Sequence, residues 1–86
     1  MYSVSILPSA LRDLGSLPRS VQERIRDKID ALALSPRPVG AKALKGSEGR
    51  MRLRVGDYRV IYRIDDAERF VLISRIGHRR EIYRRA

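Results

Sequence analysis

Arginines recur at close spacing in one segment of this chain, residues 50–63. The five are Arg50, Arg52, Arg54, Arg59 and Arg63. A guanidinium group binds phosphate through two parallel hydrogen bonds and stays protonated, so it neutralises negative charge well and accepts protons badly. The segment therefore favours binding and orienting a phosphodiester over moving its protons.

A second set of candidate residues lies near the C-terminus and comprises His78, Arg79 and Tyr83. RNA cleavage needs no protein nucleophile, because the 2′-hydroxyl can attack its own phosphate once the bond is oriented, charge is neutralised and protons are moved. Arginines suit the first two tasks, and Tyr83 or His78 would perform the third. No serine lies at a recognisable spacing from His78 and no carboxylate pair forms an obvious site, so serine-hydrolase and paired-carboxylate chemistry are unsupported.

Metal and cofactor chemistry has no support in the composition. The chain has no cysteine and one histidine, which excludes a disulfide framework and a thiolate metal site and leaves His78 unable to build a metal site alone. No segment approaches the roughly 20 apolar residues of a membrane span, and the N-terminus has no apolar signal core. We expect a soluble, cytoplasmic protein without a cofactor.

The arginine segment predicts two strands joined by a turn at Gly56-Asp57. If these two residues form the turn, Val55 lies opposite Tyr58, and the alternation of side chains puts the five arginines on one face. The other face collects Met51, Leu53, Val55, Tyr58, Val60, Tyr62 and Ile64, so both tyrosines are expected in the core. Directly opposed like charges destabilise a strand pair by up to about 1 kcal/mol, and the arginine face therefore predicts an anionic partner.

The remaining elements are read from apolar spacing and turn residues. Residues 2–7 predict a strand; Leu7, Leu11 and Leu14 predict a helix that begins near Pro8. Val21, Ile25, Ile29 and Leu32 predict a second helix, whose charged outer face is expected to be simply solvated. Residues 69–76 predict a last strand, covered on most of both faces, followed by a polar, basic tail.

Residues 39–49 predict a loop of small residues whose glycines form turns, with Lys42 and Lys45 as further candidate contacts to a polyanion. At 86 residues the chain is expected to form one domain over residues 1–86. The predicted order is β-α-α-β-β-β, an α+β fold with two N-terminal helices packed on one face of a small antiparallel sheet. The arginine face would then stay open.

The net charge of +9 is concentrated in the second half of the chain. Residues 1–34 carry five basic and four acidic side chains, a net +1, whereas residues 35–86 carry fourteen basic and six acidic, a net +8. Sixteen of the nineteen basic residues are arginine, which binds phosphate and stacks on bases. The distribution favours a polyanionic partner for the hairpin half.

Several segments together resemble the RelE/ParE superfamily of toxins from type II toxin–antitoxin pairs, and its RelE branch in particular. They are residues 8–14, Leu17-Pro18, residues 35–38, Leu44-Lys45-Gly46, residues 53–62 and Gly77-His78-Arg79. The resemblance covers nearly the whole chain, and the hairpin segment is its most specific part.

The resemblance implies a metal-independent endoribonuclease that enters the ribosomal A site, cuts mRNA and is neutralised by a cognate, acidic RelB-like antitoxin in a hetero-oligomer. By this resemblance Arg59 and Arg79 match phosphate-stabilising arginines and Tyr83 matches an active-site tyrosine. Arg50 and Arg52 stand where some members have lysines. Two alternatives stay open: a ParE-like toxin that poisons DNA gyrase, and a basic RNA- or ribosome-binding module without chemistry.

Overall fold

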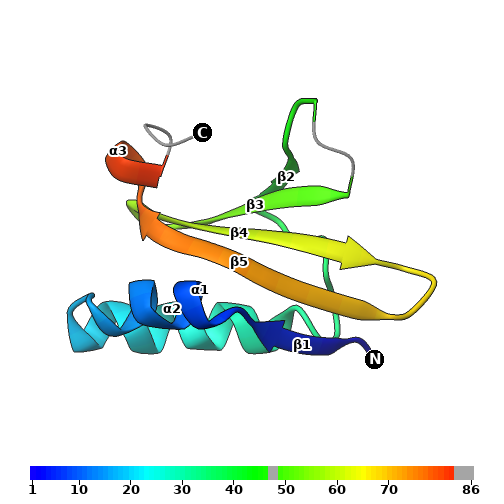
Figure 1. The fold of residues 1–86 in the computed structure, drawn as a ribbon, viewed down its shortest axis with the longest axis horizontal. Helices are drawn as coiled ribbons and strands as arrows, with labels where there is room; N and C mark the ends of the chain where they lie inside the picture. Colours follow the sequence, from blue (N-terminus) through cyan, green and yellow to red (C-terminus); the bar gives the residue numbers. More distant parts are fainter. Residues whose placement is uncertain (47–48, 83–86) are drawn as a thin grey trace.

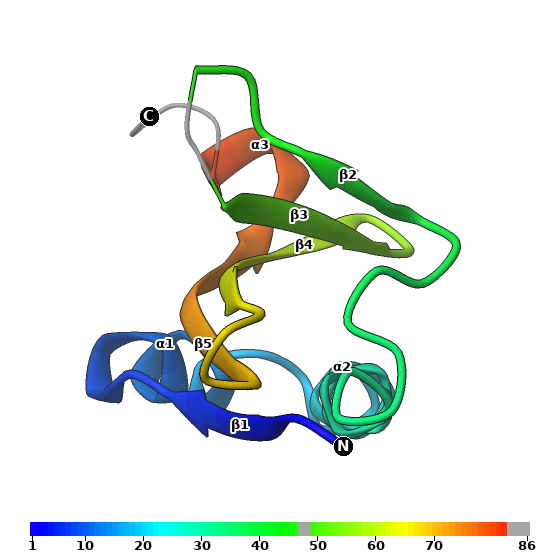
Figure 2. The same ribbon diagram turned by 90° about the vertical axis from the view of Figure 1, so that its right-hand side faces the viewer.

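The computed structural model describes residues 1–46 and 49–82 and shows an α+β fold, as predicted (Figure 1). The elements in chain order are β1 (Ser3–Ile6), α1 (Pro8–Gly15), α2 (Arg19–Ala31), β2 (Ala41–Ala43), β3 (Arg50–Val55), β4 (Tyr58–Asp65), β5 (Phe70–His78) and α3 (Arg79–Ile82). The strands form one sheet in the order β1-β5-β4-β3-β2. Both long helices lie on one face of it, and Figure 2 shows β1 and β2 at its two edges. No helix in the described ranges is long and apolar enough to span a membrane.

Two proline-led helices cover the sheet. Pro8 opens α1, where a missing backbone N–H costs nothing, and Pro18 precedes α2. In α2 the predicted apolar stripe is confirmed, since Ile25 and Ile29 are buried and Leu32, at the C-cap, is fully buried.

The predicted stripe of α1 is only partly right. Leu14 is buried as expected, but Leu7 and Leu11 are 37% and 47% exposed. Ala10 is buried in their place. Ala10 and Leu14 are four residues apart and share one helix face, and the short alanine side chain lets α1 approach β5 closely. The leucine spacing therefore indicated the helix but not its buried side.

The β3–β4 hairpin has the predicted register. Val55 pairs with Tyr58, Arg54 with Arg59 and Arg50 with Arg63. Gly56 has a φ of 60°, which suits the first central residue of a type II′ turn and matches the right-handed twist of the strands.

The predicted apolar face of the hairpin forms the core. It packs with α1, α2, β1 and β5, and its members are Met51, Leu53, Val55, Val60, Tyr62 and Ile64, with Tyr58 half-buried against them. Tyr62 donates its hydroxyl to the Pro36 carbonyl at 2.7 Å, and burial raises its pKa to about 12. Both tyrosines are thus core residues, as predicted.

A bulge in β5 explains its nearly continuous apolar sequence. Tyr62 pairs with Ile73 but the preceding Ile61 pairs with Arg75, so Ser74 is an extra residue on β5. The extra residue reverses the alternation, and therefore Ile76 lies on the same face as Ile73 instead of the opposite one. As predicted, β5 is covered on both faces, since each of its residues is buried or half-buried.

Four features differ from the sequence prediction. The loop expected at 39–49 contains β2, which pairs with β3, and the basic tail contains the short helix α3. The sheet is antiparallel except at β1, which pairs parallel with β5 because the long intervening connection returns the chain in the same direction. The arginine face is not fully open either, because α3 lies on the side of the sheet opposite α1 and α2 (Figure 1).

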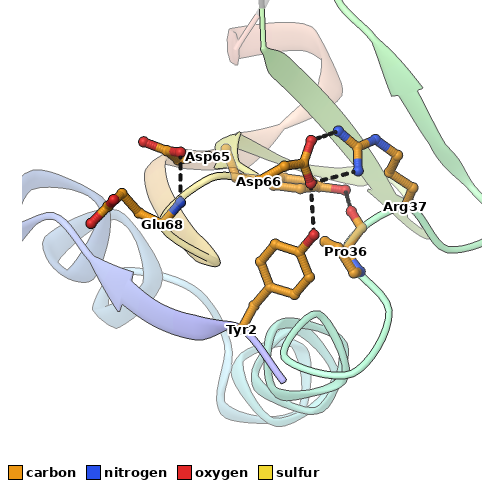
Figure 3. Close-up of polar contacts among 7 residues, drawn as sticks. Tyr2, Pro36, Arg37, Asp65, Asp66 and Glu68 are labelled. Carbon is orange, nitrogen blue, oxygen red and sulfur yellow. Dashed lines mark hydrogen bonds and ion pairs between the residues drawn. The ribbon is translucent and has the colours of Figure 1, made fainter.

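A polar cluster fixes the end of the sheet farthest from α3 (Figure 3). Asp66, in the β4–β5 turn, accepts two hydrogen bonds from Arg37 at 2.9 and 3.2 Å and one from the Tyr2 hydroxyl at 2.6 Å. The bonds from Arg37, and to a smaller extent the bond from Tyr2, lower the pKa of the Asp66 carboxyl to about 2. The hydrogen bond to Asp66 in turn raises the pKa of the Tyr2 hydroxyl. The cluster joins the chain before β1, the turn after β4 and the loop after α2.

Candidate functional site

The arginine face is built by the β3–β4 register. Residues paired across two antiparallel strands point to the same side of the sheet, so the pairs Arg50–Arg63 and Arg54–Arg59 each place two guanidinium groups side by side. Arg52 lies between these pairs and opposite Ile61. The five arginines therefore share one face, as predicted.

Strand β2 adds Lys42 to this face. Lys42 pairs with Arg52 and therefore points to the same side of the sheet. Lys45 is exposed in the turn that follows β2, next to the sheet edge. The structure thus brings Lys42 to the arginines and leaves Lys45 at their border.

A shallow hollow of about 190 Å³ opens among these cations. It is lined by Gly40, Lys42, Arg52, Arg54 and Arg59. The volume is below the roughly 300 Å³ at which pockets for drug-sized ligands begin, so the hollow suits a phosphate with part of its sugar. Four cationic side chains therefore line a space that has room for one anionic group.

Two arginines are held at the hairpin turn. The Nη1 of Arg59 donates to the Gly56 carbonyl at 3.0 Å and to the Tyr58 carbonyl at 2.9 Å. Arg79 donates its backbone N–H to the Asp57 carbonyl at 2.8 Å, and its Nε lies 3.8 Å from the Asp57 carboxylate. Both of these Arg59 bonds leave from Nη1, and within residues 1–46 and 49–82 the Nε and Nη2 edge of the guanidinium makes no hydrogen bond or ion pair, so it can receive an anion. The structure therefore brings Arg59 and Arg79 to one corner of the sheet.

His78 lies on the other side of the sheet from these arginines. It pairs with Tyr58 in the β4–β5 register and meets that ring edge to face, with centroids 5.5 Å apart. Its Nδ1 accepts a hydrogen bond from the Arg80 backbone at 3.2 Å. The imidazole lines a hollow of about 440 Å³ that also contains Asp13. The structure does not bring His78 into the arginine face.

Tyr83 lies outside the described residues. The helix that precedes it, α3, contacts β4 and β5. Its Ile82 is 3% exposed, and Ile61, which lies on the arginine face of β4, is 5% exposed. A Cβ added at Gly77 would lie 3.9 Å from Ile82, so the glycine leaves room for this side chain. The described part of α3 therefore ends on the arginine side of the sheet.

Arg75 is a further residue of the arginine face that the sequence pattern did not predict. It pairs with Ile61 and so points to the arginine face, where its Nη1 donates to the Ile82 carbonyl at 3.3 Å. Without the bulge at Ser74, Arg75 would oppose Val60 and point into the core. An arginine between Ile73 and Ile76 in a buried strand was the available signal, because a core cannot hold an unpaired charge.

Comparison with known proteins identifies the family. The sequence model described as "ParE toxin of type II toxin-antitoxin system, parDE" matches residues 4–83. The chain belongs to the RelE/ParE family of toxins. The toxin RelG of Mycobacterium tuberculosis is similar over 85 residues, with 38% identity and 98% of both chains covered.

Solved structures of RelE/ParE toxins share the fold. A chain of the RelBE2 toxin–antitoxin complex from Mycobacterium tuberculosis is 35% identical with a TM-score of 0.76, covering 90% of this chain and 96% of that one. A chain of the archaeal RelE–RelB complex from Pyrococcus horikoshii OT3 is 29% identical with a TM-score of 0.82, covering 93% and 97%. The family membership and the α+β fold predicted from the sequence are thereby confirmed.

Proposed function

We propose that this RelE/ParE toxin is a metal-independent endoribonuclease that cuts mRNA in the ribosomal A site and thereby inhibits translation in the cytoplasm. The observation that carries the proposal is the hollow on the sheet face, where Lys42, Arg52, Arg54 and Arg59 converge on space for one phosphate group. Preorganised cations stabilise the charge that develops at phosphorus, and such electrostatic stabilisation is usually the largest contribution to catalysis.

The proposed reaction is an internal transesterification. A base removes the proton of the 2′-hydroxyl, the O2′–P bond forms, the P–O5′ bond breaks, and the departing O5′ receives a proton. The products are a 2′,3′-cyclic phosphate and a 5′-hydroxyl. Arg59 and Arg79 stabilise the phosphorane-like transition state, and the flanking backbone is bound by Arg50, Arg52, Arg54, Arg63, Lys42 and Lys45.

Proton transfer is assigned to Tyr83 in preference to His78. His78 packs against Tyr58 on the helix-covered side of the sheet. Tyr83 follows Ile82, whose helix lies over the arginine face. A general acid or base must come within hydrogen-bond reach of its proton, and this arrangement supports the tyrosine.

The direct test is cleavage of an mRNA by purified toxin on translating ribosomes. We expect cut transcripts that end in a 2′,3′-cyclic phosphate, and no cut at a nucleotide whose 2′-hydroxyl is replaced by hydrogen. Cleavage of the 2′-deoxy substrate would contradict the proposed attack, because that substrate lacks the nucleophile.

A gyrase-poisoning activity is the second candidate, favoured by the ParE description of the matching family. It predicts gyrase inhibition and DNA breaks while mRNA stays intact. Measuring supercoiling by purified gyrase beside the ribosome assay separates the two. A third possibility, a basic ribosome-binding module, predicts bound but uncut RNA.

We also propose that an acidic RelB-like antitoxin neutralises this chain in a hetero-oligomer. The RelE chains of the similar M. tuberculosis and P. horikoshii structures were solved in complex with RelB-type antitoxins. The paired guanidinium groups of the arginine face repel one another, so carboxylates from a partner would relieve that repulsion.

A further inference from the structure

A second cationic hollow lies beside the arginine face, between α2 and the hairpin turn. Its volume is about 460 Å³, and three cations line it: Arg24 and Lys28 from α2, and Arg54 from β3. Asp27 is the one carboxylate in its lining. We propose that this α2 groove binds the backbone of the RNA strand where the strand leaves the arginine face.

The two hollows adjoin one another. Gly40 and Arg54 line both of them. The backbone N–H of Arg54 donates to the Gly40 carbonyl at 3.1 Å, so this backbone pair forms the border between the two spaces. The Arg54 side chain is a cation shared by both hollows, and we infer that a phosphodiester chain crosses the border beside it.

Arg24 is placed on this path by the turn. Its Nη2 lies 3.0 Å from the position that a Cβ on residue 56 would occupy, so the absence of a side chain at Gly56 lets the guanidinium approach. The Gly56 carbonyl is one of the two that hold Arg59. Arg24 thus joins the corner that holds Arg59 and Arg79, although sequence spacing assigned it to a solvated helix face.

The chemistry of the groove fits a single-stranded nucleic acid. Proteins that bind single strands without reading sequence use a cationic groove that follows the phosphates. A groove that adjoins the arginine face would extend the contact to nucleotides beside the scissile bond. This inference rests on the proposed function for the choice of RNA, but its test does not require cleavage.

The test compares two double variants of α2 with the same loss of charge. Arg24→Ala/Lys28→Ala removes the two helix cations of the groove, whereas Arg19→Ala/Arg26→Ala removes two exposed cations of the same helix that line neither hollow. The probe is a 2′-O-methyl single-stranded RNA, which cannot be cut, and its affinity is measured by fluorescence anisotropy over a range of salt concentrations.

We expect the first variant to bind more weakly and to lower the salt slope by about 1.4, since each phosphate contact contributes about 0.7 for single strands. The Arg19/Arg26 variant should keep the wild-type slope. A dinucleotide has a single phosphodiester and cannot place a phosphate in both hollows at once, so it should bind all three proteins alike. Arg24→Lys/Lys28→Arg, which keeps both charges, should restore the slope.

Equal loss of RNA affinity in both double variants would overturn the groove, because the effect would then follow net charge alone. A folding defect in the first variant is recognised by circular dichroism, and Lys28→Ala alone then carries the test. Failure of the proposed cleavage appears separately, as intact mRNA on ribosomes. If the wild-type protein binds no free RNA at all, the groove proposal is wrong, whereas the cleavage proposal is still decided by the ribosome assay.

Discussion

Proton transfer is the step of the proposed reaction that arginines perform poorly, so it needs another residue. A guanidinium group binds anions through several N–H donors and offers no acceptor for a proton, so arginines such as Arg50, Arg52, Arg59 and Arg79 suit charge stabilisation and not proton transfer. A tyrosine can act as an acid and, when its phenol is ionised, as a base. We therefore propose that the arginines bind phosphate and that Tyr83 transfers the proton.

We predict that Tyr83→Phe slows single-turnover cleavage about 10²–10⁴-fold, the usual loss for a general acid or base, and leaves RNA affinity unchanged. Arg59→Ala should lower both affinity and rate, because it removes a charge that touches phosphate. His78→Ala serves as the control and should cleave at close to the wild-type rate. A large loss in His78→Ala with a near-normal Tyr83→Phe would reverse the assignment.

Arg75 is predicted to be a positioning residue. Its bond to the Ile82 carbonyl holds the last turn of α3, and the next residue in the chain is Tyr83. Arg75→Ala should lower the cleavage rate, up to about 10²-fold since a displacement near 1 Å can cost this much, with little change in RNA affinity.

Arg63→Ala is the matched control for Arg75 on the same face. It should weaken RNA binding through lost charge and leave the rate at saturating RNA nearly unchanged. Arg75→Lys should restore part of the rate if a donor to Ile82 is what matters. An Arg75 variant that loses affinity but not rate would be a phosphate contact instead.

At the scale of elements, the hairpin could be predicted completely and its neighbours only in part. Alternation and a two-residue turn fix the β3–β4 register within the segment itself. In contrast, β2 has the sequence Ala-Lys-Ala, which has no strand signal of its own and becomes a strand by pairing with β3. The bulge at Ser74 and the docking of α3 likewise depend on tertiary contacts.

The site was predictable to the same extent. The five arginines of the face follow from the hairpin, and Lys42 was proposed from its charge alone before β2 placed it opposite Arg52. Arg75 and Arg24 were missed because their positions depend on a bulge and on a close approach between α2 and a glycine turn. Sequence spacing cannot show the bulge or the approach of Arg24 to Gly56, since each depends on contacts between separate segments of the chain.

The cluster of Tyr2, Arg37 and Asp66 makes stability depend on acidity. The pKa of Asp66 is about 2 in the folded protein, below the 3.8 of the free side chain, so the folded state binds the proton less readily than the unfolded chain. Its stabilising effect is therefore fully present above about pH 4 and is lost as the pH falls towards 2. The thermal midpoint should drop across this range.

Asp66→Asn tests that dependence. The variant should have a lower midpoint than the wild type at pH 5, and the difference should shrink as the pH approaches 2, where the carboxyl of the wild type is also neutral. Asp30→Asn, on the exposed face of α2, is the control for a change of one charge. A constant difference between Asp66→Asn and wild type across the range would exclude the cluster as the cause.

At the scale of the whole molecule, the net charge is concentrated in the half of the chain that contains the hairpin. Residues 35–86 carry a net +8 from fourteen basic and six acidic residues, and the arginine face holds five of these basic residues. The α2 groove adds Arg24 and Lys28 from residues 1–34 beside that face. A field of one sign speeds the encounter with an oppositely charged partner and is screened by salt beyond about 10 Å at 0.1 M. The same face would thus attract RNA and an acidic antitoxin.

We predict that the association rate with the antitoxin falls steeply with salt while the dissociation rate changes little, because electrostatic steering acts mainly on encounter. Arg52→Glu/Arg54→Glu should lower the association rate about tenfold or more at low salt and abolish toxicity. Stopped-flow mixing of the purified partners at low and high salt measures both rates.

Arg19→Glu/Arg26→Glu is the matched control for antitoxin binding, since it makes the same change in net charge on exposed positions of α2. If steering comes from the arginine face, this control should keep most of the association rate and its toxicity. If instead the two reversals slow association equally, net charge alone attracts the antitoxin. An association rate that does not depend on salt, or full neutralisation of a toxin whose Arg52 and Arg54 are reversed, would mean that the antitoxin binds the helical side and leaves the arginine face uncovered.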